Sequence, residues 1–393
     1  MNANACVVFD ERLTEYNFGP SHPMAPVRVD LTIALAREFG LIDPSCLDEV
    51  TAEPASDELL ATVHDERYIE GVKHLSAHPT ESNLALGLGS EDNPVFAHMH
   101  EASALIAGAS VEAARRVWTG ASRHAINVSG GLHHAMPGAA SGFCIYNDVA
   151  LAIAWLLANG AERIVYIDVD AHHGDGVQKM FYDEPRVLTI SVHESPKTLF
   201  PGTGYATESG AEGAEGSSVN VALPPGTSDA GWLRAFHAVV PDLVREFKPQ
   251  IIVSQQGCDS HMDDPLTNLM LSVDGQRASY LAIRALAEEV CDGKWVATGG
   301  GGYSVMDVVP RAWVHLMAIV AGRDIDPETA TPEGWRARIA AMRDLPAPSR
   351  MTDGRSTAFR PWTQGYDPAS WLDRSILETR AELFPTFGLD PQP

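Results

Sequence analysis

Short apolar runs alternate with longer segments of helical periodicity along most of the chain. The apolar runs are rich in β-branched residues and end in polar or glycine-containing segments, which is typical of buried strands. They comprise residues 7–9, 125–128, 164–169, 187–192, 251–254 and 295–298. Helical periodicity covers residues 96–118, 148–158, 229–247, 274–291 and 306–320. This alternation predicts an α/β fold with a single open, mostly parallel β-sheet flanked by helices.

Two parts of the chain depart from this alternation. Residues 77–94 are rich in Gly, Ser and Asn, and we expect a surface loop there. From residue 345 onward the chain is Pro-rich, with one short predicted helix that is capped by Asp367, opened by Pro368 and continued to Leu383. We therefore expect an α/β domain at residues 1–344 and a C-terminal extension at 345–393 that packs on it.

Composition and charge narrow the classes of partner. The 393 residues include 28 Lys and Arg against 52 Asp and Glu, and the formal net charge of −24 disfavours nucleic acids and anionic membranes. The chain has neither a membrane-spanning apolar stretch nor the pattern of an N-terminal signal peptide. Five scattered cysteines without a C-x-x-C pair predict neither disulfides nor a cysteine-bound zinc. We expect a soluble, cytoplasmic protein.

The densest cluster of ionisable residues follows the apolar run at 164–169. Residues 167–176 contain three Asp and two His, and the alternating Asp168, Asp170 and His172 project to one side where the strand ends. Burying so many ionisable groups is costly unless they are paired or bound to a metal. Carboxylate and imidazole groups together suit a divalent metal ion. The run therefore predicts a metal site.

Three other predicted strands also end in unusual polar or glycine-rich segments. These segments are His133-His134 after residues 125–128, residues 255–259 after 251–254, and residues 299–303 after 295–298. Because ligands bind beyond the carboxyl ends of parallel strands, we expect all four segments to surround one crevice. The glycine run lacks the G-x-G-x-x-G dinucleotide fingerprint, and no G-x-S-x-G elbow indicates a serine hydrolase.

Together these motifs resemble the histone deacetylase superfamily, particularly its bacterial acetoin-utilization deacetylase branch. The resemblance extends to residues 16–23 with Arg28, residues 141–148 and residues 200–204, and it covers nearly the whole chain. It implies zinc-dependent hydrolysis of N6-acetyl-lysine to acetate and lysine. The implied substrate is an acetylated lysine in a protein or peptide, with an acyl-CoA synthetase as a candidate target, and an oligomer is possible.

The resemblance implies two cation sites. It assigns Asp170, His172 and Asp259 as ligands of one catalytic Zn²⁺ ion. Three protein ligands and an open position suit a hydrolytic zinc, which lowers the pKa of a bound water from near 16 to about 7. A structural cation, usually K⁺, is implied as well. Its ligands would be Asp168, the Ser191 hydroxyl and the backbone oxygens of Asp170, His172 and Val192.

The resemblance also implies the residues that carry out catalysis. His133 and His134 would flank the attacking water, and Asp168 and Asp175 would fix the tautomers of these two imidazoles. We expect His134 to shuttle the proton to the departing amine, with His133 as its electrostatic partner. Tyr303 would donate its hydroxyl to the oxyanion of the tetrahedral intermediate.

Five further residues are implied to bind the substrate. Phe143 and Phe200 match the aromatic walls of a narrow tunnel for the acylated side chain. Asp92 matches a carboxylate at the tunnel rim that holds the substrate backbone. Gly142 and Gly301 are expected to contact the substrate within the tunnel.

Three alternative functions remain open at this point. An acetylpolyamine amidohydrolase would share the same catalytic residues. An acyl-lysine-binding module without catalysis would not need the complete set that ends at Tyr303. An arginase-like binuclear manganese hydrolase would need additional Asp residues where this chain has Gly174 and His261, so we expect one catalytic metal.

Overall fold

The computed structural model describes residues 4–393 and contains one open sheet in which every strand pair is parallel. The strands are β1 (Ala5–Val8), β2 (Leu47–Val50), β3 (His124–Asn127), β4 (Ile164–Asp168), β5 (Val187–Glu194), β6 (Ser218–Leu223), β7 (Ile251–Gln255) and β8 (Trp295–Thr298). Their order across the sheet is β2-β1-β3-β8-β7-β4-β5-β6. The predicted α/β class is confirmed, and the sheet is fully rather than mostly parallel. Residues 1–3, part of the segment predicted to lack a signal peptide, lie outside the described residues.

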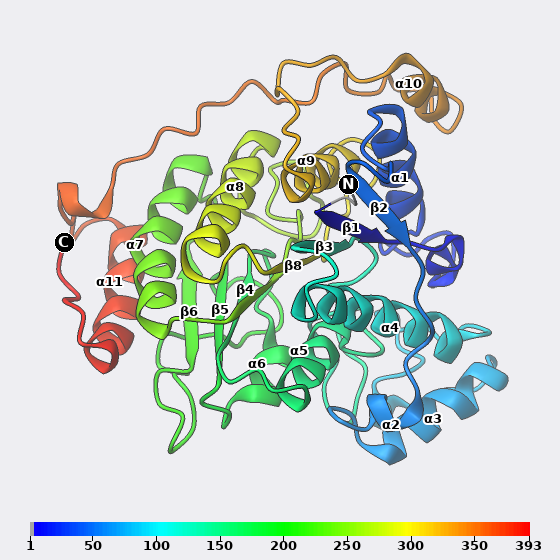
Figure 1. The fold of residues 1–393 in the computed structure, drawn as a ribbon, viewed down its shortest axis with the longest axis horizontal. Coiled ribbons are helices and arrows are strands. Elements are labelled where there is room, and N and C mark those ends of the chain that lie inside the picture. The colour runs from blue at the N-terminus through cyan, green and yellow to red at the C-terminus, as the bar shows by residue number, and fades with distance from the viewer. Residues whose placement is uncertain (1–3) are drawn as a thin grey trace.

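Helices cover both faces of the sheet (Figure 1). Helices α4 (Met99–Trp118), α5 (Asp148–Ala158) and α6 (Asp175–Phe181) lie on one face. The other face carries α1 (Val27–Glu38), α7 (Asp229–Phe247), α8 (Val273–Val290) and α9 (Val309–Ala321). The periphery carries α2 (Asp57–Leu60), α3 (Glu66–Ala77), α10 (Glu333–Ala340) and α11 (Trp371–Leu383). All five helices predicted before residue 345 are present, with ends shifted by a few residues.

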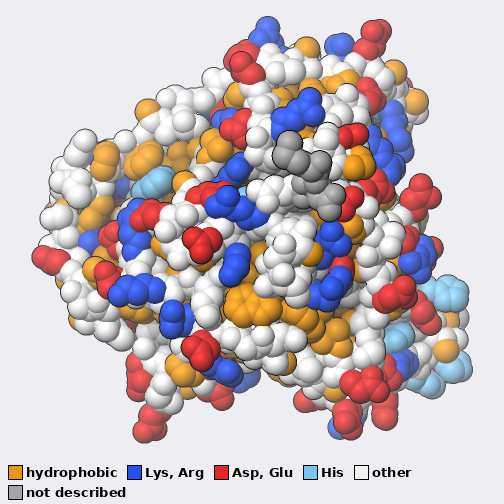
Figure 2. Space-filling view, in the orientation of Figure 1, with side chains coloured by type: hydrophobic (Ala, Val, Ile, Leu, Met, Phe, Trp, Pro, Cys, Tyr) orange, Lys and Arg blue, Asp and Glu red, His pale blue; other side chains and the backbone are white. Residues whose placement is uncertain are grey.

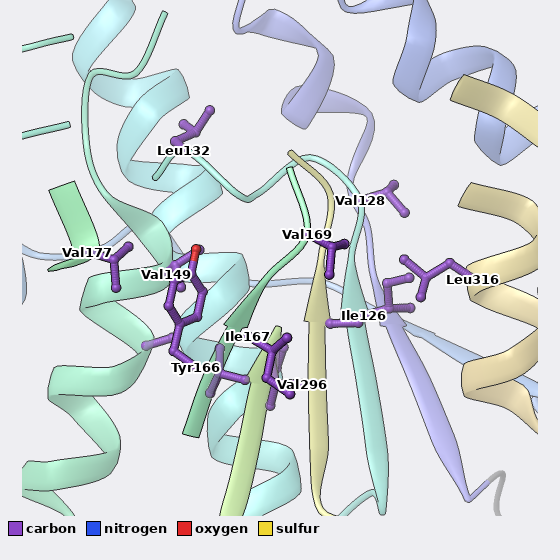
Figure 3. Packing of buried hydrophobic residues seen from close by; sticks show 14 of the residues in the cluster. Ile126, Val128, Leu132, Val149, Tyr166, Ile167, Val169, Val177, Val296 and Leu316 are labelled. Atoms are coloured by element: carbon purple, nitrogen blue, oxygen red, sulfur yellow. The ribbon is translucent and has the colours of Figure 1, made fainter. Parts of the chain in front are cut away.

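The central strands are buried on both sides, which explains their continuous apolar sequences. Every residue of β4 is buried, as is every residue of β7 and β8. Figure 3 shows Ile126, Tyr166, Ile167 and Val296 packed between the strands and the covering helices. All five cysteines are buried with free thiols, in agreement with the prediction that no disulfide forms.

The sequence pattern did not reveal the two edge strands. Strand β2 has the sequence LDEV and β6 has SVNVAL, so neither forms a long apolar run. Both strands lie at the edges of the sheet, where only one side pairs with a neighbour and polar side chains are tolerated. The predicted loop at 77–94 is largely irregular, with a short 3-10 helix at Leu84–Leu86.

The surface carries charged side chains of both signs, and the helices are those of a chain without a long apolar stretch. On the face shown in Figure 2, Lys and Arg side chains are scattered among Asp and Glu side chains. Within residues 4–393, no helix combines the length and the apolar character that crossing a membrane requires.

The C-terminal helix α11 packs against β6 and α7. Its N-cap is Ser370, whose side chain accepts a hydrogen bond from the backbone N–H of Asp373. The predicted cap, Asp367, lies three residues earlier and accepts from the N–H of Ala369 instead, so that boundary was wrong. The helix places Asp373 against Arg234 of α7, with distances of 2.8 and 2.9 Å between carboxylate oxygens and guanidinium nitrogens.

Replacing Asp373 by alanine should lower the free energy of unfolding by about 3–5 kcal/mol, because it leaves a buried guanidinium without its carboxylate. Both side chains of the pair are at most 6% exposed. Urea denaturation of Asp373→Ala measures the effect, with Asp30→Ala as the control, because Asp30 forms an exposed ion pair with Arg338 that should contribute little. An unchanged stability in Asp373→Ala would show that the C-terminal extension is not an integral part of the fold.

Candidate active site

The four strands that carry the predicted site are neighbours at the centre of the sheet, in the order β3-β8-β7-β4. One row of paired residues, Asn127, Thr298, Gln255 and Asp168, lies at or near the carboxyl ends of all four strands. The loops that follow therefore start from the same edge. This arrangement brings together residues separated by more than 150 positions in the chain.

Asp170, His172 and Asp259 converge beyond this edge. One potential ligand atom from each lies within 4.8 Å of the others, and all three residues are buried. The Nδ1 atom of His172 is 2.9 Å from Asp259 Oδ2 and 3.1 Å from Asp170 Oδ1. Backbone N–H groups hold the other carboxylate oxygens, with Gly301 donating to Asp170 and Ala171 donating to Asp259, each at 2.7 Å.

The chemistry of this donor set fits a divalent cation. Burial and the nearby charge of Asp170 raise the pKa of Asp259 above its ordinary value. Two buried carboxylates that face one imidazole nitrogen form a group that a Zn²⁺ ion would neutralise. A Cβ atom added at Gly301 would lie only 2.1 Å from Asp259 Oδ2, so a glycine is needed for the close approach.

The surroundings favour one metal rather than two. Among residues 4–393, this is the only group of three His, Cys, Asp or Glu side chains with ligand atoms converging in this way. At Gly174, where an arginase-like site needs Asp, an added Cβ would lie 2.3 Å from Asp168 Oδ2. His261, at the second such position, is hydrogen-bonded to Asp353. Neither of these two positions therefore provides a carboxylate for a second metal.

The two adjacent histidines are each held by a buried carboxylate, as predicted. His133 Nδ1 is 2.7 Å from Asp168 Oδ2, and His134 Nδ1 is 2.6 Å from Asp175 Oδ1. Because a carboxylate only accepts, both Nδ1 atoms donate, and the Nε2 atoms lie 3.1 Å apart. Asp168 also accepts from the Tyr166 hydroxyl at 2.6 Å, a partner that the sequence did not reveal.

The surroundings of the two imidazoles shift their pKa values in opposite directions. Burial disfavours a charged His133, but the carboxylates of Asp168 and Asp170 outweigh burial and raise the pKa of His133 to about 9. Burial and the adjacent charge of His133 lower the pKa of His134 despite its contact with Asp175. The pKa of His134 thus favours the neutral form, which has a lone pair to accept a proton, while the pKa of His133 favours the charged form.

A cavity of about 230 Å³ leads to these residues. It is lined by Asp92, His134, Gly142, Phe143, His172, Leu199, Phe200, Leu266 and Tyr303. The Phe143 ring lies 5.7 Å from the Tyr303 ring, and the Phe200 ring lies 5.1 Å from the His134 ring. Four of the predicted substrate-binding residues line the cavity, but Gly301 does not, since it lies against the carboxylates of Asp170 and Asp259. Its contact with substrate stays a prediction.

Tyr303 is positioned by a residue that the sequence analysis missed. Its backbone N–H donates to Asp264 Oδ2 at 2.8 Å, and the other oxygen of Asp264 accepts from the N–H of Leu266 at 3.0 Å. Asp264 thereby connects the tyrosine with a wall of the cavity. Burial, together with the carboxylates of Asp259 and Asp170, raises the pKa of Tyr303 well above its usual value, so its hydroxyl remains a donor. A single Asp in a polar loop gave no signal of this role.

The motif at residues 16–23 supports the rim of the cavity. His22 Nδ1 accepts from the N–H of Met24, so its Nε2–H donates to the backbone oxygen of Asp92 at 3.2 Å. Its ring lies 4.6 Å from that of Phe143. The Tyr16 hydroxyl donates to the backbone oxygen of Phe143 at 2.7 Å. These contacts hold the backbone at Asp92 and one aromatic wall.

Two of the residues predicted for the structural cation are neighbours across β4 and β5. Asp168 pairs with Ser191, and Val192 follows in β5. The Ser191 hydroxyl lies 2.8 Å from His193 Nδ1. Binding of K⁺ at this position stays a prediction.

Comparison with known proteins identifies the class that this fold and site define. Residues 22–320 match the model of the histone deacetylase domain. The chain therefore belongs to the histone deacetylase family and is a hydrolase of that family. The fold of this family implies a catalytic metal, in agreement with the buried Asp170–His172–Asp259 group.

Within this family the chain is similar to acetoin utilization proteins. It is 41% identical to acetoin utilization protein AcuC of Bacillus subtilis (strain 168), over 88% of this chain and 89% of that protein. The AcuC protein of Staphylococcus xylosus is 37% identical, over 88% of this chain and 90% of its own length. The crystal structure of an HDAC homolog from Aquifex aeolicus has a TM-score of 0.82 at 27% identity, covering 95% of this chain and 99% of that one. A second similar structure is an HDAC homolog complexed with SAHA.

Proposed function

We propose that the protein is a zinc-dependent deacetylase that hydrolyses the N6-acetyl group of lysine in a protein or peptide. The observation that carries this proposal is a cavity lined by His134, His172 and Tyr303. His133 lies against His134, and Asp170 and Asp259 lie against His172. Family membership supports amide hydrolysis, and a cavity of about 230 Å³ with Phe143 and Phe200 in its lining suits an acylated aliphatic side chain.

In the proposed mechanism, Asp170, His172 and Asp259 hold the zinc ion, which would polarise the acetyl carbonyl and acidify a water molecule. His134, whose pKa is lowered, accepts the water proton at Nε2 and later delivers it to the departing amine. His133 keeps its positive charge beside the reacting atoms through its contact with Asp168.

The other lining residues bind the substrate in this mechanism. Phe143 and Phe200 enclose the aliphatic part of the lysine side chain, and Asp92 accepts a backbone N–H of the substrate at the exposed rim. Gly142 keeps the wall beside His134 thin, because an added Cβ there would lie 2.4 Å from the His134 ring. We also propose K⁺ at the Asp168–Ser191 position, where it would adjust the electrostatics of His133.

Replacing Tyr303 by phenylalanine should lower kcat by roughly a hundred- to a thousand-fold, because the oxyanion loses a donor. The zinc content should stay unchanged, since the phenol does not belong to the group of converging ligand atoms. Steady-state kinetics on an acetyl-lysine peptide, together with metal analysis, would measure both. Turnover like that of the wild type would overturn the role assigned to Tyr303.

The substrate class is tested by a panel of acylated compounds on zinc-loaded protein. We expect acetyl-lysine peptides to be hydrolysed faster than acetylated putrescine or spermidine. Phe200 and Leu266 at the cavity are 47% and 38% exposed, which leaves the opening accessible to a peptide in the single chain. Faster hydrolysis of the acetylpolyamines would favour an acetylpolyamine amidohydrolase instead.

We propose an acyl-CoA synthetase as the protein substrate. We also propose that the protein acts on it in the cytoplasm. Similarity to acetoin utilization proteins supports this choice. Mass spectrometry of an acetylated acyl-CoA synthetase, before and after incubation with the protein, would show whether acetyl groups are removed. Retention of every acetyl group would argue for another target.

A further inference from the structure

The segment between α10 and α11, which we call the strap (residues 345–370), crosses the helices on one face of the sheet (Figure 1). It lies outside the part of the chain that matches the histone deacetylase domain, residues 22–320. Part of the strap is nevertheless firmly attached. The backbone oxygen of Met351 accepts from His315 Nε2 at 2.9 Å, and the Thr352 hydroxyl donates to Asp274 at 2.6 Å.

Asp353 of the strap contacts three separate elements. Its Oδ2 atom accepts from the N–H of Val273, the first residue of α8, at 2.8 Å. The same oxygen is 2.9 Å from His261 Nε2, and its Oδ1 atom is 2.9 Å from a guanidinium nitrogen of Arg311 in α9. His261 and Arg311 are 1% and 4% exposed, whereas the Asp353 side chain is 20% exposed, so these contacts link two buried residues to a partly buried carboxylate. One carboxylate thus joins the strap to α8, to α9 and to the loop after β7.

The direction of the hydrogen bond between His261 and Asp353 follows from the other ring nitrogen. His261 Nδ1 accepts from the backbone N–H of Asp263 at 3.0 Å, so the ring donates through Nε2 to Asp353. His261 also provides its backbone oxygen to the N–H of Asp264 at 3.0 Å. The residue therefore holds the short loop between Asp259, a proposed zinc ligand, and Asp264, which positions Tyr303.

We propose that Asp353 is a positioning residue of the metal site, acting through His261 on the loop from Asp259 to Asp264. This inference rests on the proposed metal centre. A carboxylate ligand must be held within a fraction of an ångström to bind zinc well, and residues that orient ligands affect metal affinity strongly. The strap, although it lies outside the matched domain, is then part of the active-site scaffold.

The test compares Asp353→Ala with Thr352→Val, a matched control that removes another anchor of the same strap without affecting His261. Zinc affinity of the metal-free proteins is measured by competition with a chelator, and stability is measured by urea denaturation. Asp353→Ala should weaken zinc binding roughly 10- to 100-fold and lower kcat with little change in KM. Thr352→Val should lower stability while its zinc affinity stays at the wild-type value. An equal loss of zinc affinity in both variants would overturn the positioning role.

The route through His261 is tested by His261→Ala, alone and combined with Asp353→Ala. Both changes break the same contact between His261 and Asp353. We therefore expect the zinc affinity of the double variant to be no lower than that of the single variant with the lower zinc affinity. Additive losses would contradict the route. If Asp353→Ala does not fold, His261→Ala tests the same contact, and wild-type zinc affinity in it overturns the proposal. Failure of the wild-type protein to bind zinc would instead contradict the metal centre itself.

Discussion

Replacing Asp259 by alanine should remove the bound metal and, with it, measurable hydrolysis. Asp259 is the only one of the three proposed ligands that comes from the loop after β7, whereas Asp170 and His172 both follow β4. Its loss leaves one carboxylate and one imidazole, which is fewer than the three protein ligands of a catalytic zinc site. Metal analysis after dialysis, followed by an assay on an acetyl-lysine peptide, would measure both effects.

Asp263→Ala is the control for this experiment, because Asp263 lies in the same loop but its side chain is 71% exposed. This variant should retain one equivalent of zinc and nearly full activity. One equivalent of zinc retained by Asp259→Ala would contradict the ligand assignment. Two equivalents of manganese and no zinc in the active wild-type protein would contradict the single-metal site.

Replacing His134 by alanine should lower kcat by roughly a hundred- to ten-thousand-fold while zinc stays bound. His134 lines the cavity, and its Nδ1 donates to Asp175, so Nε2 is the atom available to accept and return a proton. Its lowered pKa keeps the basic form predominant at neutral pH. Protonation of His134 should therefore reduce the activity of the wild-type protein as the pH falls through the pKa of this imidazole.

His78→Ala provides the matched control, because His78 is an exposed histidine at the end of α3. It should have wild-type kinetics under the same conditions. If His134→Ala binds zinc and still turns over at the wild-type rate, the proton-transfer role belongs to another group. A His134→Ala protein that has lost its zinc would instead place this residue in the metal site.

Local sequence pattern identified the central strands, in which every residue is buried. The run at β4 has no exposed residue and was predicted within one residue, because a strand buried on both faces needs continuous apolar side chains. Strand β2, with Asp48 and Glu49, was missed because an edge strand is partly exposed. The cap of α11 was misplaced because Asp367 and Ser370 both carry capping side chains, and the sequence pattern did not distinguish them.

In the candidate site, too, some features were predictable from local sequence and others were not. The chain itself carries the Asp/His run after β4, the histidine pair and the Gly-Tyr segment. The run alone predicted a metal site, and the roles of the individual residues were predicted from the resemblance to the deacetylase family. The contacts of Asp264 with Tyr303 and of Asp353 with His261 had no such motif. Each joins an ordinary polar residue to a partner 39 or 92 positions away in the chain.

The amino-acid sequence by itself determined an α/β protein with a metal-binding run at a strand end and the motifs of a deacetylase. Only the tertiary structure decided that β3, β8, β7 and β4 are adjacent and that the strap reaches the loop beside the metal site. The pattern of apolar and polar residues in a segment shows which of its faces is buried, and this pattern involves only residues that are close in the chain. Strand order and loop paths depend on packing between distant segments, which no local pattern contains.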